Sequence, residues 1–78
     1  MSGVRKRSVT IRGHRTSFSL EDPFYDIMIS IATSRGMTVA GLIAEIDESR
    51  DRNSNLSSAL RIYVLDWVRN DTSRAVHR

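Results

Sequence analysis

The chain contains no cysteine, one proline and one tryptophan among its 78 residues. Without cysteine, neither a disulfide framework nor a thiolate metal site can add to its stability, and this absence agrees with a cytoplasmic location. No continuous apolar run approaches the roughly 20 residues that cross a bilayer, and the N-terminus lacks the apolar stretch of a signal peptide, so we expect no membrane partner. Because one core in so small a domain supplies only about 3–5 kcal/mol, we expect self-association to stabilise the fold.

Acidic residues are missing from the beginning of the chain. Residues 1–20 carry five basic and no acidic side chains, whereas residues 21–78 carry seven basic and nine acidic ones. The resulting charges of +5 and −2 combine to the formal net charge of +3. An isolated basic cluster is usually a solvated tail, but this one is continuous with a strand that carries hydroxyl groups. A polarised chain of this kind favours a polyanionic partner.

That strand is residues 15–20, where apolar and polar side chains alternate with the period of two that is typical of a half-buried strand. The face predicted to be buried carries Thr16, Phe18 and Leu20. The opposite face carries Arg15, Ser17 and Ser19. Guanidinium and hydroxyl groups can hydrogen-bond to base edges and to phosphates. The pattern therefore predicts a strand that packs one face on helices and offers the other to a nucleic acid.

A second alternating stretch, residues 8–12, precedes this strand. Gly13 and His14 separate the two stretches, and a two-residue loop that begins with glycine is a hairpin signal. The register that follows places Arg12 opposite Arg15 and keeps the apolar side chains of both stretches on one face. The other expected pairs are Ile11 with Thr16, Thr10 with Ser17, Val9 with Phe18, and Ser8 with Ser19.

Three helix patterns follow the strand. The first begins with Asp22 as its N-cap and Pro23 at the first helical position. Thr38 caps the second, and the third begins after Ser54 or Asn55 and ends near residue 69. The third pattern is apolar on more than one face, so the helix must bury two sides.

These patterns predict a mainly α-helical fold with a short β-ribbon. We expect a flexible basic arm over residues 1–7, one folded domain over residues 8–69, and a disordered tail over residues 70–78. The order of strand, helix, glycine-containing turn and helix resembles the ribbon-helix-helix family of bacterial DNA-binding proteins. The segments GHRTSFSLEDPF, IATSRGMTVAGLIAEID and NLSSALRIYVL resemble a subgroup of small members with an added C-terminal helix, and the resemblance covers residues 6–68.

The resemblance implies an obligate homodimer, in which one strand from each subunit pairs antiparallel and enters the major groove of double-stranded DNA. The residues that would contact base edges, carried over by position, are Arg15, Ser17 and Ser19. The start of the second helix, at Thr38 and Val39, would bind a phosphate through N–H groups that have no helical partner. The basic residues expected to add electrostatic affinity for phosphates are Arg5, Lys6, Arg7 and Arg12.

The extra stretch over residues 8–12 departs from a minimal family member, which has one strand per subunit. A hairpin would give the dimer four strands, and strands about 4.8 Å apart fit two abreast, but not four, in a groove about 12 Å wide. Three outcomes are open at this point. The outer strands peel away to track phosphates, residues 4–12 order only on DNA, or DNA binding has been lost.

We therefore expect a bacterial transcription regulator, cytoplasmic and associated with the nucleoid. We expect no enzymatic activity, no cofactor and no metal, because the sequence contains no phosphate-binding loop, nucleophile elbow or paired-carboxylate site. The alternative is a protein-interaction module of the same fold, antitoxin-like or an adaptor, that binds a protein partner through the third helix or the sheet. Tyr63 and Trp67, spaced i and i+4 on that helix, are more often core or dimer packing than a partner groove.

Overall fold

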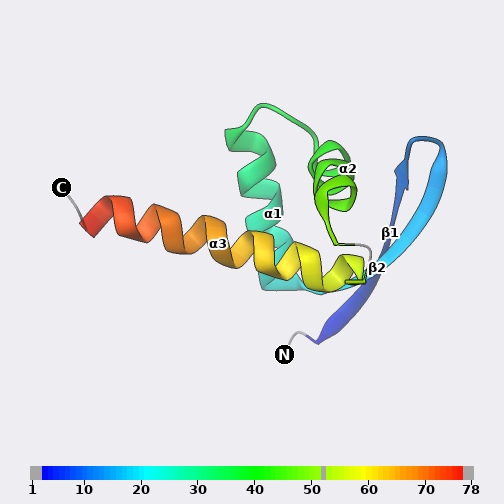
Figure 1. Cartoon of the computed structure of the whole chain (residues 1–78), viewed down its shortest axis with the longest axis horizontal. Helices are drawn as coiled ribbons and strands as arrows, with labels where there is room; N and C mark the ends of the chain where they lie inside the picture. The colour runs from blue at the N-terminus through cyan, green and yellow to red at the C-terminus, as the bar shows by residue number, and fades with distance from the viewer. Residues whose placement is uncertain (1–2, 52, 77–78) are drawn as a thin grey trace.

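The computed structural model describes residues 3–51 and 53–76, with side chains described up to residue 70. It has a two-stranded antiparallel sheet followed by three helices, in agreement with the predicted fold class. The elements in order are β1 (Val4–Ile11), β2 (His14–Glu21), α1 (Asp22–Ser34), α2 (Val39–Ser49) and α3 (Leu56–Val76). The hairpin lies at one end of the molecule, and α3 extends from it past α1 toward the opposite end (Figure 1).

The loop of the hairpin is Arg12-Gly13, not the expected Gly13-His14. Arg12 has φ 53° and Gly13 has φ 80°, the left-handed values that a type I′ turn requires at both central positions. This turn matches the right-handed twist of the flanking strands, which is why it is favoured even with arginine at the first position. The observed register pairs Ile11 with His14 and Val9 with Thr16, so the predicted register was wrong by two residues. A shift of two leaves every side chain on its predicted face.

Strand β1 is longer than expected. It begins at Val4, so residues 4–7 are strand and the flexible arm predicted over residues 1–7 is wrong there. Residues 1–2 lie outside the described part. The physical reason is that β2 continues to Glu21 and offers those residues a pairing partner, as in the pair Arg7–Phe18. The fold of the single chain therefore includes β1 along its whole length.

One hydrophobic core joins the inner face of the hairpin to all three helices. Its largest fully buried side chains come from β2 and the three helices and are less than 2% exposed. The buried apolar residues are Ile11, Phe18, Leu20, Met28, Ile31, Ala32, Leu42, Ile43, Ile46, Leu56, Leu60 and Val64. Helix α3 contributes the last three, which are spaced by four residues and so lie on one helical face. The core thus closes within one chain.

Caps set the helix boundaries largely as the sequence predicts. The Thr38 hydroxyl accepts a hydrogen bond from the Gly41 N–H at 3.0 Å at the start of α2. The Asn55 side chain accepts one from the Ser58 N–H at 2.8 Å at the start of α3. Helix α1 differs by one residue, because Asp22 is its first helical residue. Both side-chain caps satisfy N–H groups that the helix itself leaves without a partner.

Helix α3 continues to Val76, so the disordered tail predicted over residues 70–78 is wrong for residues 70–76. Residues 77–78 lie outside the described part. No glycine or proline occurs between residues 70 and 76, so no helix-breaking residue ends the helix earlier. Within the described ranges, no single helix is long and apolar enough to cross a membrane; α1 and α2 reach that length and composition only as a pair bent by 99°.

Candidate nucleic-acid interface

The outer face of the hairpin is polar and exposed. Side chains of paired residues in an antiparallel sheet point to the same face, so the pairs Thr10–Arg15 and Ser8–Ser17 share it. The exposed polar residues of this outer face are Lys6, Ser8, Thr10, Arg15 and Ser17, and Val4 is exposed at its far end. These exposed polar residues supply two cations and three hydroxyls. The opposite face of the strand pair packs on the hydrophobic core. The cations and hydroxyls can donate hydrogen bonds to phosphate oxygens or to base edges.

Ser19, the third residue predicted to contact bases, is in a different environment. It pairs with Lys6 and is half-buried. Its backbone N–H donates to the Ser57 hydroxyl of α3 at 2.8 Å. The first turn of α3 therefore meets β2 at the edge that faces away from β1.

The backbone of β2 has a defined free edge. Because Ile11 and His14 close the two-residue loop, the N–H and C=O groups of every second residue from His14 onward face β1. The corresponding groups of Arg15, Ser17 and Ser19 face away from it. The Ser19 N–H already donates a hydrogen bond to the Ser57 hydroxyl. The outward N–H and C=O groups of Arg15 and Ser17 therefore form the accessible part of this edge.

Two of the predicted phosphate contacts, Arg5 and Arg7, lie on the inner side of β1. Both guanidinium groups pair with Asp22 at the start of α1, with Arg5 Nε at 3.3 Å from Oδ1. The Arg7 side chain is 19% exposed, and its guanidinium carbon lies 3.9 Å from the centre of the Tyr25 ring. A cation–π contact and an ion pair thus hold Arg7 against the protein. The period of two was enough to place both arginines on the inner side of β1, because Arg5 and Arg7 share the phase of Val9.

The remaining predicted phosphate contacts are distributed over the surface. Lys6 is exposed on the outer face, and Arg12 at the hairpin tip lies 2.7 Å from Glu48 of α2. Thr38 is the N-cap of α2, and Val39 is its first residue. The N–H groups of a first helical turn have no partner within the helix and favour anions. The structure therefore keeps Lys6, Thr38 and Val39 reachable and engages Arg12 in an exposed ion pair.

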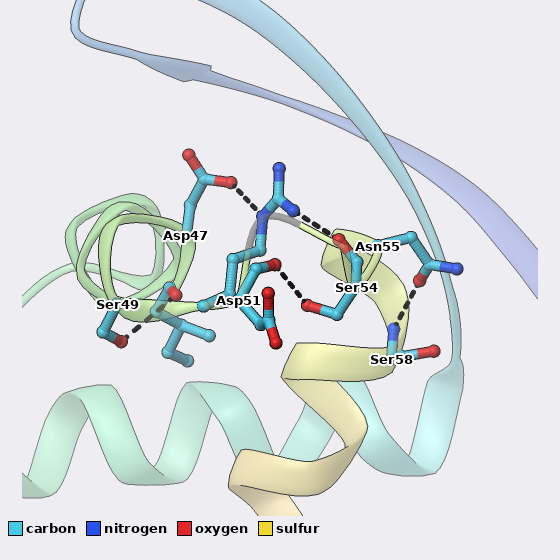
Figure 2. A network of polar contacts seen from close by, with 8 residues as sticks. Asp47, Ser49, Asp51, Ser54, Asn55 and Ser58 are labelled. Atoms are coloured by element: carbon cyan, nitrogen blue, oxygen red, sulfur yellow. Dashed lines mark hydrogen bonds and ion pairs between the residues drawn. The ribbon is translucent and has the colours of Figure 1, made fainter.

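A polar network in the linker between α2 and α3 sets where α3 begins (Figure 2). Arg50 Nε donates to Asp47 Oδ1 at 2.8 Å, and its Nη1 donates to the backbone oxygen of Ser54. The Ser54 hydroxyl donates to the Asp51 backbone oxygen at 2.8 Å. These bonds fold the linker onto the end of α2, and so they position Ser57 beside β2.

Charged groups also tie α3 to the other elements. Arg61 Nε lies 3.1 Å from Glu21 Oε1 at the end of β2. The pKa of Glu21 is lowered from its usual value, first by the hydrogen bond from its own backbone N–H and then by Arg61. Arg35 donates to Glu45 at 2.8 Å and to the Tyr63 hydroxyl at 2.9 Å. The Arg35 hydrogen bond lowers the pKa of Glu45, and the Glu45 and Tyr63 contacts raise the pKa of Arg35.

The family model of the ribbon-helix-helix domain matches residues 4–68, most of the chain. The chain belongs to the ribbon-helix-helix family. Domains of this family are DNA-binding regulators, not enzymes, and they typically bind DNA as dimers. No curated protein and no solved structure matches the chain. The match begins at the first residue of β1, so it includes the strand that a minimal ribbon-helix-helix protein lacks.

Sequence reasoning left parts of this interface out. The alternation placed Ser8 and Thr10 on the outer face, but neither was named as a candidate contact. The Ser57 and Arg61 contacts with β2 had no local signal, because they join residues about 40 positions apart. Within the described part of the chain, no group of three or more histidine, cysteine, aspartate or glutamate side chains could hold a metal ion.

Proposed function

We propose that this ribbon-helix-helix protein is a homodimeric, sequence-specific regulator of transcription that binds double-stranded DNA in the major groove. The observation that carries the proposal is the outer face of the hairpin, which is exposed, polar and basic and lies on a strand pair fixed by the core. As a bacterial regulator it acts in the cytoplasm, at the nucleoid. The β2 strands of two subunits pair and form the ribbon that enters the groove.

Electrostatics favours β2 over β1 as the strand that pairs across the dimer. Strand β1 carries Arg5, Lys6 and Arg7 in succession, and two copies of it side by side would bring like charges together. Lysine on an edge strand is a common protection against such pairing. Strand β2 carries Arg15 and Glu21, which offset each other. A two-fold pairing centred on Thr16 would use the outward N–H and C=O groups of Arg15 and Ser17.

In this arrangement the four strands have distinct roles. Four strands about 4.8 Å apart are wider than a major groove of about 12 Å, so the β1 strands lie over its rims, where the phosphates are. Arg15 then makes the base contact, because arginine can bind guanine O6 and N7 with two hydrogen bonds. Ser17 contacts a neighbouring base edge, and Ser19 does so only through its side chain. The phosphate contacts come from Lys6, Ser8, Thr10, Arg12, Thr38 and Val39.

The test is a titration of the purified protein against random duplex DNA and against selected genomic fragments at several salt concentrations. The Arg15→Ala, Ser17→Ala double variant is compared with the wild type. We expect steep salt dependence for both proteins and preference for selected fragments only in the wild type. Binding with no steep salt dependence, or a double variant that selects the same fragments equally well, would overturn the proposal.

A second candidate function is a module that binds another protein through α3. The observation in its favour is the exposure of apolar side chains on this helix, with Ile62 at 58% and Leu65 at 51%. Ile62 also lines a groove between α2 and α3, together with Ile46 and Tyr63. This candidate predicts that the double variant above retains all biological activity, whereas substitutions at Ile62 abolish it.

A further inference from the structure

A groove runs between the last turn of α2 and the first half of α3. Its apolar lining is formed by Ile46, Ala59, Ile62 and Tyr63, and its volume is about 330 Å³. Ile62 is 58% exposed, so this lining is open to a partner. Pockets that enclose a whole small ligand have volumes of about 300–1,000 Å³. A groove at the lower end of that range fits one or two anchoring side chains of a larger partner.

Two carboxylates lie beside this apolar lining. Asp51 of the linker and Asp66 of α3 both line the groove, and both are exposed. Arg50 also lines it, but its guanidinium is already engaged within the chain (Figure 2). Its Nε donates to Asp47 Oδ1 at 2.8 Å, and its Nη1 donates to the backbone oxygen of Ser54. Arg50 therefore does not offset the two negative charges of the groove.

These two carboxylates differ from most others in the chain. Over the side chains that the structure describes, the acidic residues in ion pairs are Glu21, Asp22, Glu45, Asp47 and Glu48. The described acidic residues outside such pairs are Asp26, Asp51 and Asp66, and two of these three line the same groove. A surface of this kind repels phosphate groups and attracts cationic ones.

We infer that the groove binds a segment of another protein that carries an apolar anchor side chain flanked by lysine or arginine. The apolar lining holds the anchor, and Asp51 and Asp66 pair with the flanking cations. The inference rests on the second candidate function, a protein partner bound through α3, and it names the chemistry of that partner. A basic amphipathic helix has this arrangement, because its side chains recur on one side at spacings of three and four residues.

The groove and the outer face of the hairpin are separate surfaces. The residues that line the groove come from α2, the linker and α3, and over the described ranges none comes from β1 or β2. The outer face of the hairpin points away from the helices, because its opposite face packs on the core. A chain that is bound to DNA through the hairpin therefore still presents the groove to a basic partner.

The experiment measures the affinity of the full chain for a short synthetic amphipathic peptide of leucine and lysine, by isothermal titration calorimetry. The groove variant is Ile62→Ser, Asp66→Asn. The matched control is Asp26→Asn, Ile29→Ser, which removes the same two kinds of group from α1, outside the groove, where Ile29 is 41% exposed. Circular dichroism checks that both variants are folded. We expect the groove variant to raise the dissociation constant about tenfold or more, and the control to leave it within about twofold.

A second set of titrations tests the charge separately from the apolar contact. Asp51→Asn removes one carboxylate and leaves the apolar lining intact. We expect it to raise the dissociation constant about threefold at low salt and less at high salt, because exposed ion pairs are weak and screened. A peptide with glutamate in place of lysine should bind about tenfold more weakly than the lysine peptide, because like charges then meet at the groove.

The single tryptophan of the chain locates the bound peptide. The Trp67 ring stacks on the Tyr63 ring with their centres 6.4 Å apart, and Tyr63 lines the groove. Since the peptide contains no aromatic residue, the tryptophan emission comes from the protein alone. We expect the peptide to change this emission in the wild type and in the α1 control, but not in the groove variant at the same concentrations. Binding that leaves the emission unchanged overturns the inference.

The outcomes separate this inference from both candidate functions. Equal affinities of the groove variant and the control, or of the lysine and glutamate peptides, overturn the inference, and so does a wild type that does not bind the lysine peptide. If Ile62→Ser still abolishes biological activity, the second candidate function stands with a partner of other chemistry. A groove variant that changes the oligomeric state without peptide assigns the groove to a second copy and also overturns the inference. The DNA titrations decide DNA binding independently, because Arg15 and Ser17 do not line the groove.

Discussion

The Ser57 hydroxyl accepts a hydrogen bond of 2.8 Å from the backbone N–H of Ser19. This contact joins the first turn of α3 to the free edge of β2, across 38 positions of sequence. It has two consequences. It satisfies a donor on a strand edge, and it limits the length over which another strand can pair there. The third helix therefore limits the part of the β2 edge that is free to pair.

Ser57→Ala should lower the free energy of unfolding by about 1 kcal/mol, because a half-buried N–H loses its acceptor. Urea denaturation followed by circular dichroism measures this difference. Ser58→Ala is the matched control, since it is the backbone N–H of Ser58 that bonds to Asn55. Both substitutions gain the same helix propensity, so the difference between them reports the Ser19 contact. Equal stabilities of the two variants would show that the bond contributes nothing.

The hairpin shows which features a local pattern predicts and which it does not. The alternation of side chains placed Val9 and Phe18 on the buried side, and the structure agrees. The predicted register was wrong by two residues. A shift of two residues buries the same side chains, so the alternation cannot distinguish the two registers. The choice between the loops Arg12-Gly13 and Gly13-His14 depends on the twist of the strands. This twist favours a type I′ turn, which requires positive φ at both central residues.

Gly13→Ala should destabilise the chain by about 1–2 kcal/mol, because Gly13 has φ 80° and a Cβ is disfavoured in the left-handed region. No atom lies within 4 Å of an added Cβ, so the effect comes from backbone conformation alone. Gly3→Ala is the control, since it also has open space and its φ is outside that region. Thermal unfolding of both variants measures the difference. Similar midpoints would mean that the turn relaxes to another conformation at little cost.

The candidate interface was predictable only in its local part. Arg15 and Ser17 lie on the exposed face because alternation within one strand decides it. In the composition, Arg7 is one basic residue among several, and nothing there separates it from the exposed ones. Its ion pair with Asp22 and its contact with Tyr25 depend on how α1 packs under β1. Contacts of this kind between separate elements have no signal in a short window of sequence.

Stability should fall as the pH is lowered below about 4.5, the usual pKa of glutamate. Glu21 and Glu45 have pKa values below the usual one in the folded chain, because hydrogen bonds favour their charged forms. A carboxylate of this kind stabilises the fold above its unfolded pKa, and the contribution is lost as the pH falls through its folded pKa. Urea midpoints between pH 7 and pH 3 should therefore decline less in a Glu21→Gln, Glu45→Gln variant. Parallel curves for the variant and the wild type would contradict this explanation.

Lys6 and Arg7 are neighbours in sequence on opposite faces of β1, and they should affect DNA binding differently. Lys6 is exposed on the outer face, whereas Arg7 is engaged by Asp22 and Tyr25. Lys6→Gln should therefore reduce the slope of log affinity against log salt by about 0.9, the value for one phosphate contact. Arg7→Gln should leave that slope unchanged and lower the stability of the chain, since Asp22 would lose its closest partner. Fluorescence anisotropy with labelled duplex over a series of salt concentrations measures both slopes.

The two variants remove the same formal charge, so any effect of net charge on long-range attraction is equal in both. The difference between their slopes therefore reports which face of β1 lies against the phosphates. A reduced slope for Arg7→Gln and an unchanged slope for Lys6→Gln would mean that the inner side of β1 turns toward the DNA. That result would require Asp22 to release Arg7 on binding, and it would rule out β1 as a rigid flank of the ribbon.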